Sequence, residues 1–545
     1  MNIVNKQENI SNIFFVLAVI IAAIASLFLF KQGLMPCDDA YITFRHAKNF
    51  AMDLWPAWNL TGEPVLGSTT PGFVLILGSI GLIFGSHNIE IIALFVNIIV
   101  LFFLVIISYL ITLDICKSYV ASILTAILVG FNSVNIYTLS LGFESGLFAS
   151  VVLSCFYLAR KKYYALGAIV ASIAPLIRPE GILVVAIFFL FTYFERAKLL
   201  KLILLFCIIP FIYTIYSLNF YGSVVPQSIE AKKHFSTIYK PYDETGNFDF
   251  ISRVSVITTE VQTLWVDKIQ PTLLTGFTID RSEEAQKVSA IIEGLILLFL
   301  MLAVPLYLLF KKDRRIIYFL YPIGFILLYA FIGHVQFWYL PSFITSILIV
   351  SISGAVILID KLNLKTIQHY AHFLIIFLLF FILIDNNQYR LSEEKHFIYA
   401  EDPRGSIYRY WELERFISYR NAAEALNNIS NEKIDTSLIN EVGFFGYFYK
   451  GNVFDSVGLC SPEAVAFYPP PKEDIFNSDG TYKSGSNQII PSTMVYEVKP
   501  DYLVTSRVNI LHLLEPSSVF LQDYEYLGKS GTAWGGDPVD IFKKR

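Results

Sequence analysis

Charged residues are scarce in this chain of 545 residues: Asp, Glu, Lys and Arg together make up 16% of it, whereas hydrophobic residues make up 55%. Soluble domains usually carry about 25% charged residues, so the composition excludes an ordinary soluble protein and predicts an integral membrane protein. The mean hydropathy of +0.56 agrees with this class. No basic face interleaved with aromatic residues is present, which argues against nucleic-acid binding.

Cysteine is also rare. The five cysteines have no metal-ligand spacing, and three of them lie in apolar runs, where cysteine packs as a small hydrophobic residue. The other two, Cys37 and Cys460, fall on one side of the membrane in the topology below, which would allow a disulfide, although we favour unpaired thiols. The N-terminal apolar run lacks a small-residue cleavage site, so we expect a retained first span.

Eleven apolar runs reach spanning or near-spanning length. They are 13–31, 89–112, 120–138, 146–160, 163–177, 181–195, 199–219, 288–310, 316–333, 341–360 and 366–385. A further run at 71–86 is shorter and rich in glycine, so we expect an interfacial helix on the outer surface.

Basic residues in five short loops orient these spans. They are Lys117; Arg160, Lys161 and Lys162; Arg196, Lys198 and Lys201; Lys311, Lys312, Arg314 and Arg315; and Lys361 and Lys365. Each cluster is separated from the next by two spans, so all five lie on one face. The positive-inside rule makes that face cytoplasmic. The N-terminus is then cytoplasmic, and the chain after about residue 386 lies outside.

The pattern predicts a polytopic α-helical membrane protein of about eleven spans with a C-terminal extracytoplasmic α/β domain. Residues 1–386 form the transmembrane module, with outer loops at 32–88 and 220–287, and residues 387–545 are long enough to form a core of their own. The periodicity of the second region predicts one amphipathic helix and four short strands. We expect the helix at 412–429 and the strands at 437–439, 452–455, 502–505 and 524–528.

Charged residues on the outer face are the candidates for a functional site. Asp38 and Asp39 directly follow the first span. Two adjacent carboxylates at a membrane surface are costly unless they hold a metal, a cation or a proton-transfer role, although a solvated helix end would also suit them. The triplet Arg178-Pro179-Glu180 joins two short spans, which favours a structural or ligand-binding role over a bare turn.

A second basic group stands on the outer face, where the positive-inside rule does not predict one. Lys232, Lys233 and His234 lie early in the loop 220–287. Two interpretations remain open: contact with anionic lipid headgroups, or capture of a lipid phosphate or pyrophosphate by Lys and His donors.

The stretches DDAYITFRHAKNF and WNLTGEPVLGSTTP resemble the first outer loop of polyprenyl-phosphate-dependent glycosyltransferases of the GT-C superfold. The greatest likeness is to bacterial arabinofuranosyl- and mannosyltransferase-type members. Further similar motifs follow in the same order as in that family: GFESGLF, RPEG, YGSVVPQSIEAK, FWYLPS, NEVGFFGYF, VFDSVGL and KPDYLV. The resemblance covers nearly the whole chain. It departs from the family at residues 53–56, where a Gly-rich turn is usual, and at Leu66 and Gln227, where Glu and Asn are common.

The resemblance implies transfer of a sugar from a polyprenyl-phosphate donor to a cell-envelope glycan or glycolipid acceptor, such as lipopolysaccharide. The reaction would take place on the periplasmic side of a bacterial inner membrane, with inversion expected. Since the sugar arrives on a lipid, no nucleotide-binding loop is needed, and no GxGxxG fingerprint opens a βαβ unit here.

In this interpretation Asp39 or Asp38, with a preference for Asp39, is the base that deprotonates the acceptor hydroxyl. Arg45 is a substrate-binding candidate, because it falls on the same face about two turns later if the segment is helical. The remaining candidates contact substrate: Arg178, Lys232 and His234 hold the phosphate, Glu144 and Glu180 orient the acceptor or the arginine, and His334 and Tyr339 lie at the mouth of later spans. A carboxylate pair can hold Mg²⁺ or Mn²⁺, but nothing in the sequence requires a metal.

Two other functions fit the sequence less well. A transporter or flippase of lipid-linked sugars would place ionisable groups near the midplane and show paired halves. Here the charges gather at one face and no internal repeat is present. A glycan ligase or polymerase, which moves a whole glycan, would use similar outer loops.

Overall fold

The computed structural model describes most of the chain in ten segments. They are residues 2–34, 37–234, 301–332, 336–361, 405–429, 435–481, 483, 489–515, 518–533 and 536–545. These residues belong to two compact units. Unit 1 comprises Met1–Met35, Ala93–Ile212 and Ile257–Glu394, and unit 2 comprises Pro36–Ile92, Tyr213–Val256 and Lys395–Arg545. The predicted domain boundary near residue 386 lies outside the described residues.

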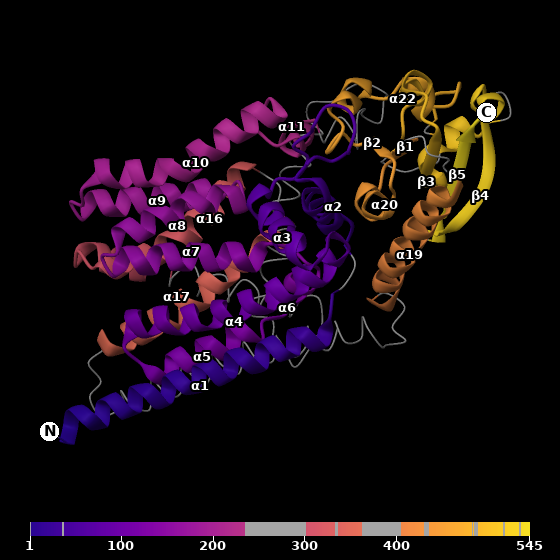
Figure 1. Cartoon of the computed structure of the whole chain (residues 1–545). Helices are drawn as coiled ribbons and strands as arrows, with labels where there is room; N and C mark the ends of the chain where they lie inside the picture. Colours follow the sequence, from indigo (N-terminus) through magenta and orange to yellow (C-terminus); the bar gives the residue numbers. More distant parts are fainter. Residues whose placement is uncertain are drawn as a thin grey trace. The chain divides into compact units, whose positions relative to one another are not determined.

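Unit 1 is a bundle of apolar helices. In chain order they are α1 (Asn2–Gln32), α4 (Ile89–Cys116), α5 (Tyr119–Gly130), α6 (Ser133–Ser140), α7 (Ser145–Arg160), α8 (Tyr164–Ile177), α9 (Gly181–Phe194), α10 (Leu199–Tyr221), a helix at 301–310, α16 (Ile317–Ile332) and α17 (Leu340–Lys361). Helices α7, α8 and α9 pack against one another, and α17 packs on α5 and α7 (Figure 1).

The lengths of these helices bear on the predicted spans. Four helical segments in the described part of the chain are long and apolar enough to cross a membrane: Asn9–Gln32, Ser86–Cys116, Leu199–Tyr221 and Phe337–Asp360. The pair α5 and α6, bent by 42°, would add a fifth. Helices α7, α8 and α9 have 16, 14 and 14 residues, and 14 residues rise only about 21 Å, less than the roughly 30 Å of a bilayer core. The count of eleven spans therefore stays a prediction.

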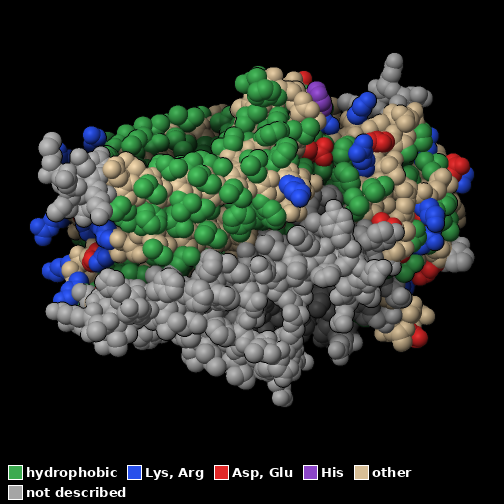
Figure 2. Space-filling model, turned by 90° about the horizontal axis from the view of Figure 1, so that it is seen from below, with side chains coloured by type: hydrophobic (Ala, Val, Ile, Leu, Met, Phe, Trp, Pro, Cys, Tyr) green, Lys and Arg blue, Asp and Glu red, His purple; other side chains and the backbone are tan. Residues whose placement is uncertain are grey.

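The basic loops meet at one end of unit 1. Asp114 near the end of α4 pairs with Lys117, Arg160 and Lys161 at 3.4, 3.3 and 2.6 Å. Arg314 pairs with Glu195 at 2.8 Å, and also donates to the carbonyl of Ala159. These contacts bring the first, second and fourth predicted basic clusters together at one end of unit 1, beside Glu195, which directly precedes the third. That this end faces the cytoplasm stays a prediction. Figure 2 shows hydrophobic side chains over these helices and Lys and Arg side chains at one end.

The ends of the helices explain why basic residues gather there. Lys117, Lys162, Arg196 and Lys312 each follow a helix and have left-handed backbones, with φ between 50° and 67°. Their amides donate back to carbonyls of the last turn. A cation at a helix C-terminus also interacts favourably with the helix dipole.

Unit 2 contains an α/β region and the outer segment that follows α1. Its main elements are α2 (Asp38–Asp53), α3 (Pro71–Phe84), α11 (Gln227–Lys233), α19 (Gly405–Ile429), β1 (Thr436–Ile439), α20 (Val442–Phe448), β2 (Asn452–Asp455), α22 (Ser492–Val498), β3 (Tyr502–Ser506), β4 (Tyr524–Thr532) and β5 (Pro538–Lys544). The predicted amphipathic helix and all four predicted strands are confirmed. Strand β5 was not predicted.

The sheet has the order β2-β1-β3-β5-β4. Strands β2, β1 and β3 are parallel, and β5 and β4 are antiparallel additions to this group. Strand β1 lies between β2 and β3, so the next strand in sequence is on one side of it and the third is on the other. The order of the parallel strands therefore reverses at β1, which makes its carboxyl end a topological switch point. Ligands of open α/β sheets usually bind at such a point. Glu441 and the first turn of α20 stand there.

Helix α3 packs directly on α2. A Cβ atom at Gly78 would lie 2.4 Å from the Phe50 ring and 3.0 Å from the Ala47 carbonyl oxygen. Only glycine therefore allows this close contact. The helix predicted at 71–86 is confirmed, and its interfacial position stays a prediction.

Candidate active site

Helix α2 carries the acidic pair, and its sequence explains its limits. Cys37 precedes it with an extended backbone, and Asp38 and Asp39 occupy the first turn, where negative charge interacts favourably with the helix dipole. The helix ends at Leu54, whose backbone is left-handed with φ 57°. Residues 40–47, which cover all faces of the helix, are buried. The segment predicted to carry the functional carboxylates is thus helical.

Asp38 binds the start of α20. Its Oδ2 accepts a hydrogen bond from the amide of Gly443 at 3.0 Å, and its Oδ1 accepts one from the amide of Phe444 at 2.7 Å. Amides in the first turn of a helix have no partner within the helix, so the buried Asp38 carboxylate caps α20 from a different part of the chain. Burial and the neighbouring Glu441 raise the pKa of Asp38 to about 8, while Arg415 and the Phe444 amide oppose the rise.

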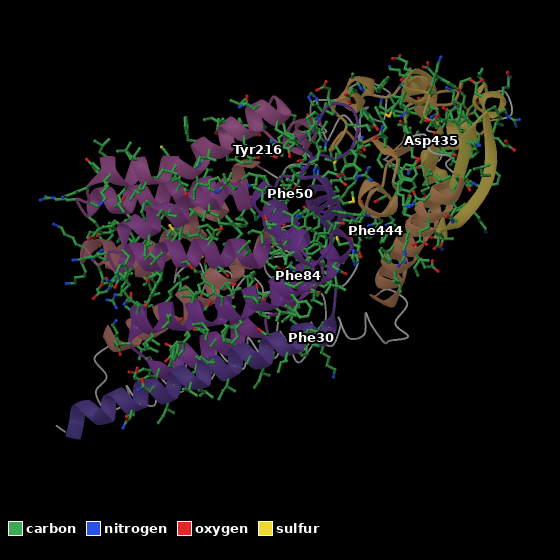
Figure 3. The ribbon with its side chains drawn as sticks, in the orientation of Figure 1. Phe30, Phe50, Phe84, Tyr216, Asp435 and Phe444 are labelled. Atoms are coloured by element: carbon green, nitrogen blue, oxygen red, sulfur yellow. The ribbon has the colours of Figure 1, made fainter. Side chains whose placement is uncertain are left out.

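The contact between α2 and α20 depends on a glycine. A Cβ atom at Gly443 would lie 1.8 Å from the carbonyl oxygen of Asp38. Because that oxygen belongs to the backbone, it cannot rotate away. Phe444, labelled in Figure 3, packs its ring against that of Tyr41 with a centroid distance of 5.1 Å. The two helices are therefore in direct backbone and side-chain contact.

Arg45 binds the other end of α20. Its guanidinium donates five hydrogen bonds: to the carbonyl of Trp58 at 2.7 Å, to Asn59 at 3.2 Å and to the carbonyls of Gly446, Tyr449 and Gly451. It is 4% exposed. A guanidinium has five donors, so these contacts leave none for a substrate phosphate.

Asp39 lies beside Asp38 in a different environment. Its side chain is exposed, and within the described part of the chain its carboxylate accepts no hydrogen bond. The surrounding protein raises the pKa of Asp39 by desolvation; the charge of Lys232 lowers it, Glu441 raises it and Arg415 lowers it. Of the two neighbouring carboxylates, Asp39 is the one that remains available to an incoming group.

Helix α11 brings Lys232 near Asp39. The amide of Gln227 donates to the carbonyl of Leu66 at 2.8 Å, and its side chain donates to the carbonyl of Gly458 at 3.2 Å. Two positions that depart from the family pattern, Leu66 and Gln227, thus hold this segment in place. Lys232 and His234 are both exposed.

Sequence reasoning did not identify two charged residues of this site. Arg415 on α19 and Glu441, directly before α20, form an ion pair at 3.2 Å, with side chains 7% and 11% exposed. Glu441 belongs to the motif NEVGFFGYF, and Arg415 to the predicted amphipathic helix. A charged residue between a strand and an apolar helix was the available signal for Glu441.

A second group of predicted residues meets in unit 1. Arg178 pairs with both Glu144 and Glu180, and all three side chains are at most 8% exposed. The guanidinium also stands over the ring of Tyr339, 4.4 Å from its centre. Four predicted site residues thus form one cluster. With every group ionised it carries one net negative charge.

His334 lies outside the described residues. Cys460 is a buried free thiol, so the disulfide between Cys37 and Cys460 that the topology would allow is not formed. In the described part of the chain, no group of three or more His, Cys, Asp or Glu side chains has a geometry that could hold a metal ion.

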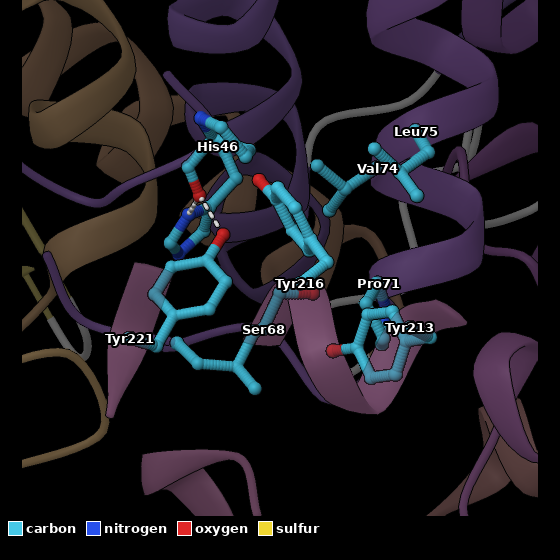
Figure 4. A pocket seen from close by; sticks show the side chains of 10 residues that line it. His46, Ser68, Pro71, Val74, Leu75, Tyr213, Tyr216 and Tyr221 are labelled. Atoms are coloured by element: carbon cyan, nitrogen blue, oxygen red, sulfur yellow. Dashed lines mark hydrogen bonds between the residues drawn. The ribbon is translucent and has the colours of Figure 1, made fainter. Parts of the chain in front are cut away.

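A small cavity lies beside α2 (Figure 4). Its lining residues are His46, Pro56, Leu66, Ser68, Pro71, Val74, Leu75, Tyr213, Tyr216 and Tyr221. Both His46 Nδ1, at 2.8 Å, and the Tyr221 hydroxyl, at 2.7 Å, hydrogen-bond to the carbonyl of Pro56. Burial lowers the pKa of His46 to about 4, so the ring is neutral. The water-accessible volume of about 10 Å³ holds one water molecule and no sugar.

Known structures share this architecture. ArnT from Cupriavidus metallidurans bound to undecaprenyl phosphate aligns over 97% of this chain and 97% of its own, with a TM-score of 0.56 and 10% sequence identity. The archaeal oligosaccharyltransferase AglB from Archaeoglobus fulgidus, in complex with an inhibitory peptide and a dolichol-phosphate, aligns over 91% of this chain and 70% of its own, with a TM-score of 0.51 and 14% identity.

The chain has the GT-C superfold. Together with the apolar helices, this identifies a multi-pass membrane protein. The same oligosaccharyltransferase tethered to an acceptor peptide aligns over 96% of the chain and 74% of its own, with a TM-score of 0.51 and 15% identity. No protein-family profile and no curated protein matches the sequence.

Proposed function

We propose that this protein transfers a sugar from a polyprenyl-phosphate donor to a hydroxyl of a cell-envelope glycan or glycolipid, with Asp39 as the general base. The contrast between the two adjacent carboxylates carries the proposal. Asp38 is occupied by two amides of α20, whereas Asp39 is exposed and accepts no hydrogen bond in the described part of the chain. A carboxylate with free lone pairs can accept the proton of an acceptor hydroxyl.

The chemistry requires one proton transfer and one substitution. The acceptor O–H gives its proton to the Asp39 carboxylate, and the acceptor oxygen forms a bond to the anomeric carbon of the donor. The bond between that carbon and the phosphate oxygen breaks with its electron pair, so polyprenyl phosphate leaves. Attack opposite the leaving group through an oxocarbenium-like transition state inverts the anomeric configuration. The proton on Asp39 then passes to water.

Lys232 is the best candidate for holding the departing phosphate. Its charge acts on Asp39, and its side chain is exposed. An ammonium group stabilises negative charge as it develops on the phosphate. His234, at the end of the same short helix, would act beside it. The two neighbouring folds that hold dolichol-phosphate and undecaprenyl phosphate support a lipid-phosphate donor.

The two arginines predicted from the sequence as site residues, Arg45 and Arg178, do not hold the phosphate in this proposal. Arg45 holds the C-terminal end of α20, because all five of its donors form hydrogen bonds within the protein. Arg178 organises the cluster of Glu144, Glu180 and Tyr339. Because this cluster carries a net negative charge, it suits hydroxyl groups of a sugar better than a phosphate.

The positive-inside rule supports an orientation with the basic end of unit 1 in the cytoplasm. The N-terminus is then cytoplasmic, and the C-terminal domain is periplasmic in a bacterial inner membrane. Donors on the outer side arrive on lipids, which agrees with a site that has no nucleotide-binding loop.

The test uses the full-length protein in detergent and in proteoliposomes, with a panel of polyprenyl-phosphate sugars and glycolipid acceptors. The proposal predicts that free polyprenyl phosphate appears only when an acceptor is present, in equal amounts with glycosylated product. If the donor instead crosses the proteoliposome membrane intact without release of polyprenyl phosphate, the protein is a transporter. If a whole glycan moves as one piece, it is a ligase.

A further inference from the structure

The C-terminal region of unit 2 places a buried ion pair near the acidic pair Asp38 and Asp39. Arg415 and Glu441 are 3.2 Å apart and almost fully removed from solvent. Removing two charges from water is costly. A buried ion pair therefore need not stabilise the fold. Its position near Asp38 and Asp39 suggests a role at these carboxylates instead.

The ion pair is connected to helix α2, which carries Asp38 and Asp39, through direct contacts of α20. Glu441 directly precedes α20, and the amides two and three residues further on bind Asp38. Gly443 touches the carbonyl of Asp38 with no room for a Cβ atom. Arg415 also stands over the ring of Phe444, 5.5 Å from its centre. Neither charge can move far without moving α20 relative to α2.

We propose that the Glu441–Arg415 pair is a positioning element of the Asp39 centre and sets how readily the Asp39 carboxylate ionises. Its consequence for catalysis rests on the proposed function, whereas its effect on Asp39 does not. Glu441 places a negative charge near Asp39, and the positive charge of Arg415 offsets part of its effect.

Charged groups face Asp39 from each described element around it. They are Asp38 on α2, Lys232 on α11, Arg415 on α19 and Glu441 before α20. Glu441 raises the pKa of Asp39, and both Lys232 and Arg415 lower it. Removing Glu441 and removing Arg415 must therefore shift the ionisation of Asp39 in opposite directions, which a purely structural pair would not do.

Dicyclohexylcarbodiimide provides a test that needs no substrate. It reacts with a protonated carboxyl group to give an O-acylisourea, which rearranges to a stable N-acylurea. Labelling of Asp39 in the full-length protein, located by mass spectrometry, falls as the carboxyl loses its proton. We expect the midpoint of this fall to move to lower pH in Glu441→Gln and to higher pH in Arg415→Gln. The double variant should return towards the wild type.

Glu424→Gln is the matched control, because the exposed Arg420–Glu424 pair at 2.8 Å lies on the same helix α19. Its midpoint should equal that of the wild type. Unchanged midpoints in the single variants, or shifts in the same direction, would overturn the inference. Circular dichroism checks folding, and if one single variant misfolds, the other single variant still has a predicted sign.

Sugar transfer by the same samples separates this inference from the proposed function. If labelling shifts as expected but the wild type transfers no sugar from any donor in the panel, the proposed function fails and the positioning role stands. If transfer occurs and its acid limb follows the labelling midpoints, both hold. Transfer without any shift of the midpoints overturns only the positioning role.

Discussion

Asp38 and Arg45 lie seven residues apart on α2 and bind opposite ends of α20. Seven residues of helix rise about 10.5 Å, and α20 itself has seven residues, so the spacing of the two charges matches the length of the helix they bind. The Asp38 carboxylate binds the N-terminal amides and the Arg45 guanidinium binds the C-terminal carbonyls, which is the favourable arrangement for the dipole of α20. Asp39 is left outside this arrangement.

The cap that Asp38 provides should be measurable as stability. Asp38→Ala removes both acceptors and should lower the free energy of unfolding by about 1–2 kcal/mol, as loss of a helix cap does. Asp38→Asn keeps one acceptor oxygen and should lose less. Thermal unfolding in detergent, followed by intrinsic fluorescence, measures both. Equal transitions in the wild type and Asp38→Ala would contradict the capping role.

Arg45→Lys should be destabilising although it keeps the charge. One ammonium cannot replace five donors in a planar fork, so several buried carbonyls lose their partner, at a cost of at least about 2 kcal/mol. The melting temperature should fall, while KM for the lipid donor at low temperature stays unchanged. A raised KM with an unchanged melting temperature would contradict this structural role and favour substrate binding by Arg45.

Much of this site could be predicted from the sequence because helical geometry is periodic. The spacing of Asp38 and Arg45 indicated one face of a helix, and that is where both lie. The order of outer-face motifs identified Glu144, Arg178, Glu180 and Tyr339, which form one cluster.

The roles of individual residues could not be predicted, since they depend on what lies opposite. Nothing in the order of residues shows that Asp38 accepts hydrogen bonds from amides some 400 positions later. Nor does it show that Arg45 uses all five donors on four backbone carbonyls and the Asn59 side chain. Glu441 and Arg415 gain their importance only from tertiary contact. Strand β5 was missed because Asp540 and two lysines interrupt its short apolar pattern.

Arg178 should contribute strongly to the stability of unit 1. Arg178→Met leaves Glu144 and Glu180 buried without a partner, which should destabilise the protein by about 3–5 kcal/mol. Adding Glu144→Gln and Glu180→Gln removes the unpaired charges and should restore much of the melting temperature. Arg420→Met, in an exposed pair, is the control and should change little. A triple variant as unstable as Arg178→Met would show that charge pairing is not the cause.

Lys232→Gln should change the pH dependence of transfer. The charge of Lys232 lowers the pKa of Asp39, so its removal raises that pKa, and the base then ionises only at higher pH. The acid limb of kcat/KM should move to higher pH, with KM for the donor increased. Lys529→Gln, an exposed change on β4, should leave the profile unchanged. A limb that moves to lower pH would show that the lysine does not act on the base.

The most direct test of the account is the rate of sugar transfer in a single turnover by Asp39→Asn and Asp38→Asn, each with its melting temperature. The amide of Asp39→Asn cannot take the proton, so we predict a rate at least about a hundredfold lower at an unchanged melting temperature. Asp38→Asn should show the reverse: transfer retained and a lower melting temperature. Full transfer by Asp39→Asn, or its loss only in Asp38→Asn, would contradict the assignment of Asp39 as the base.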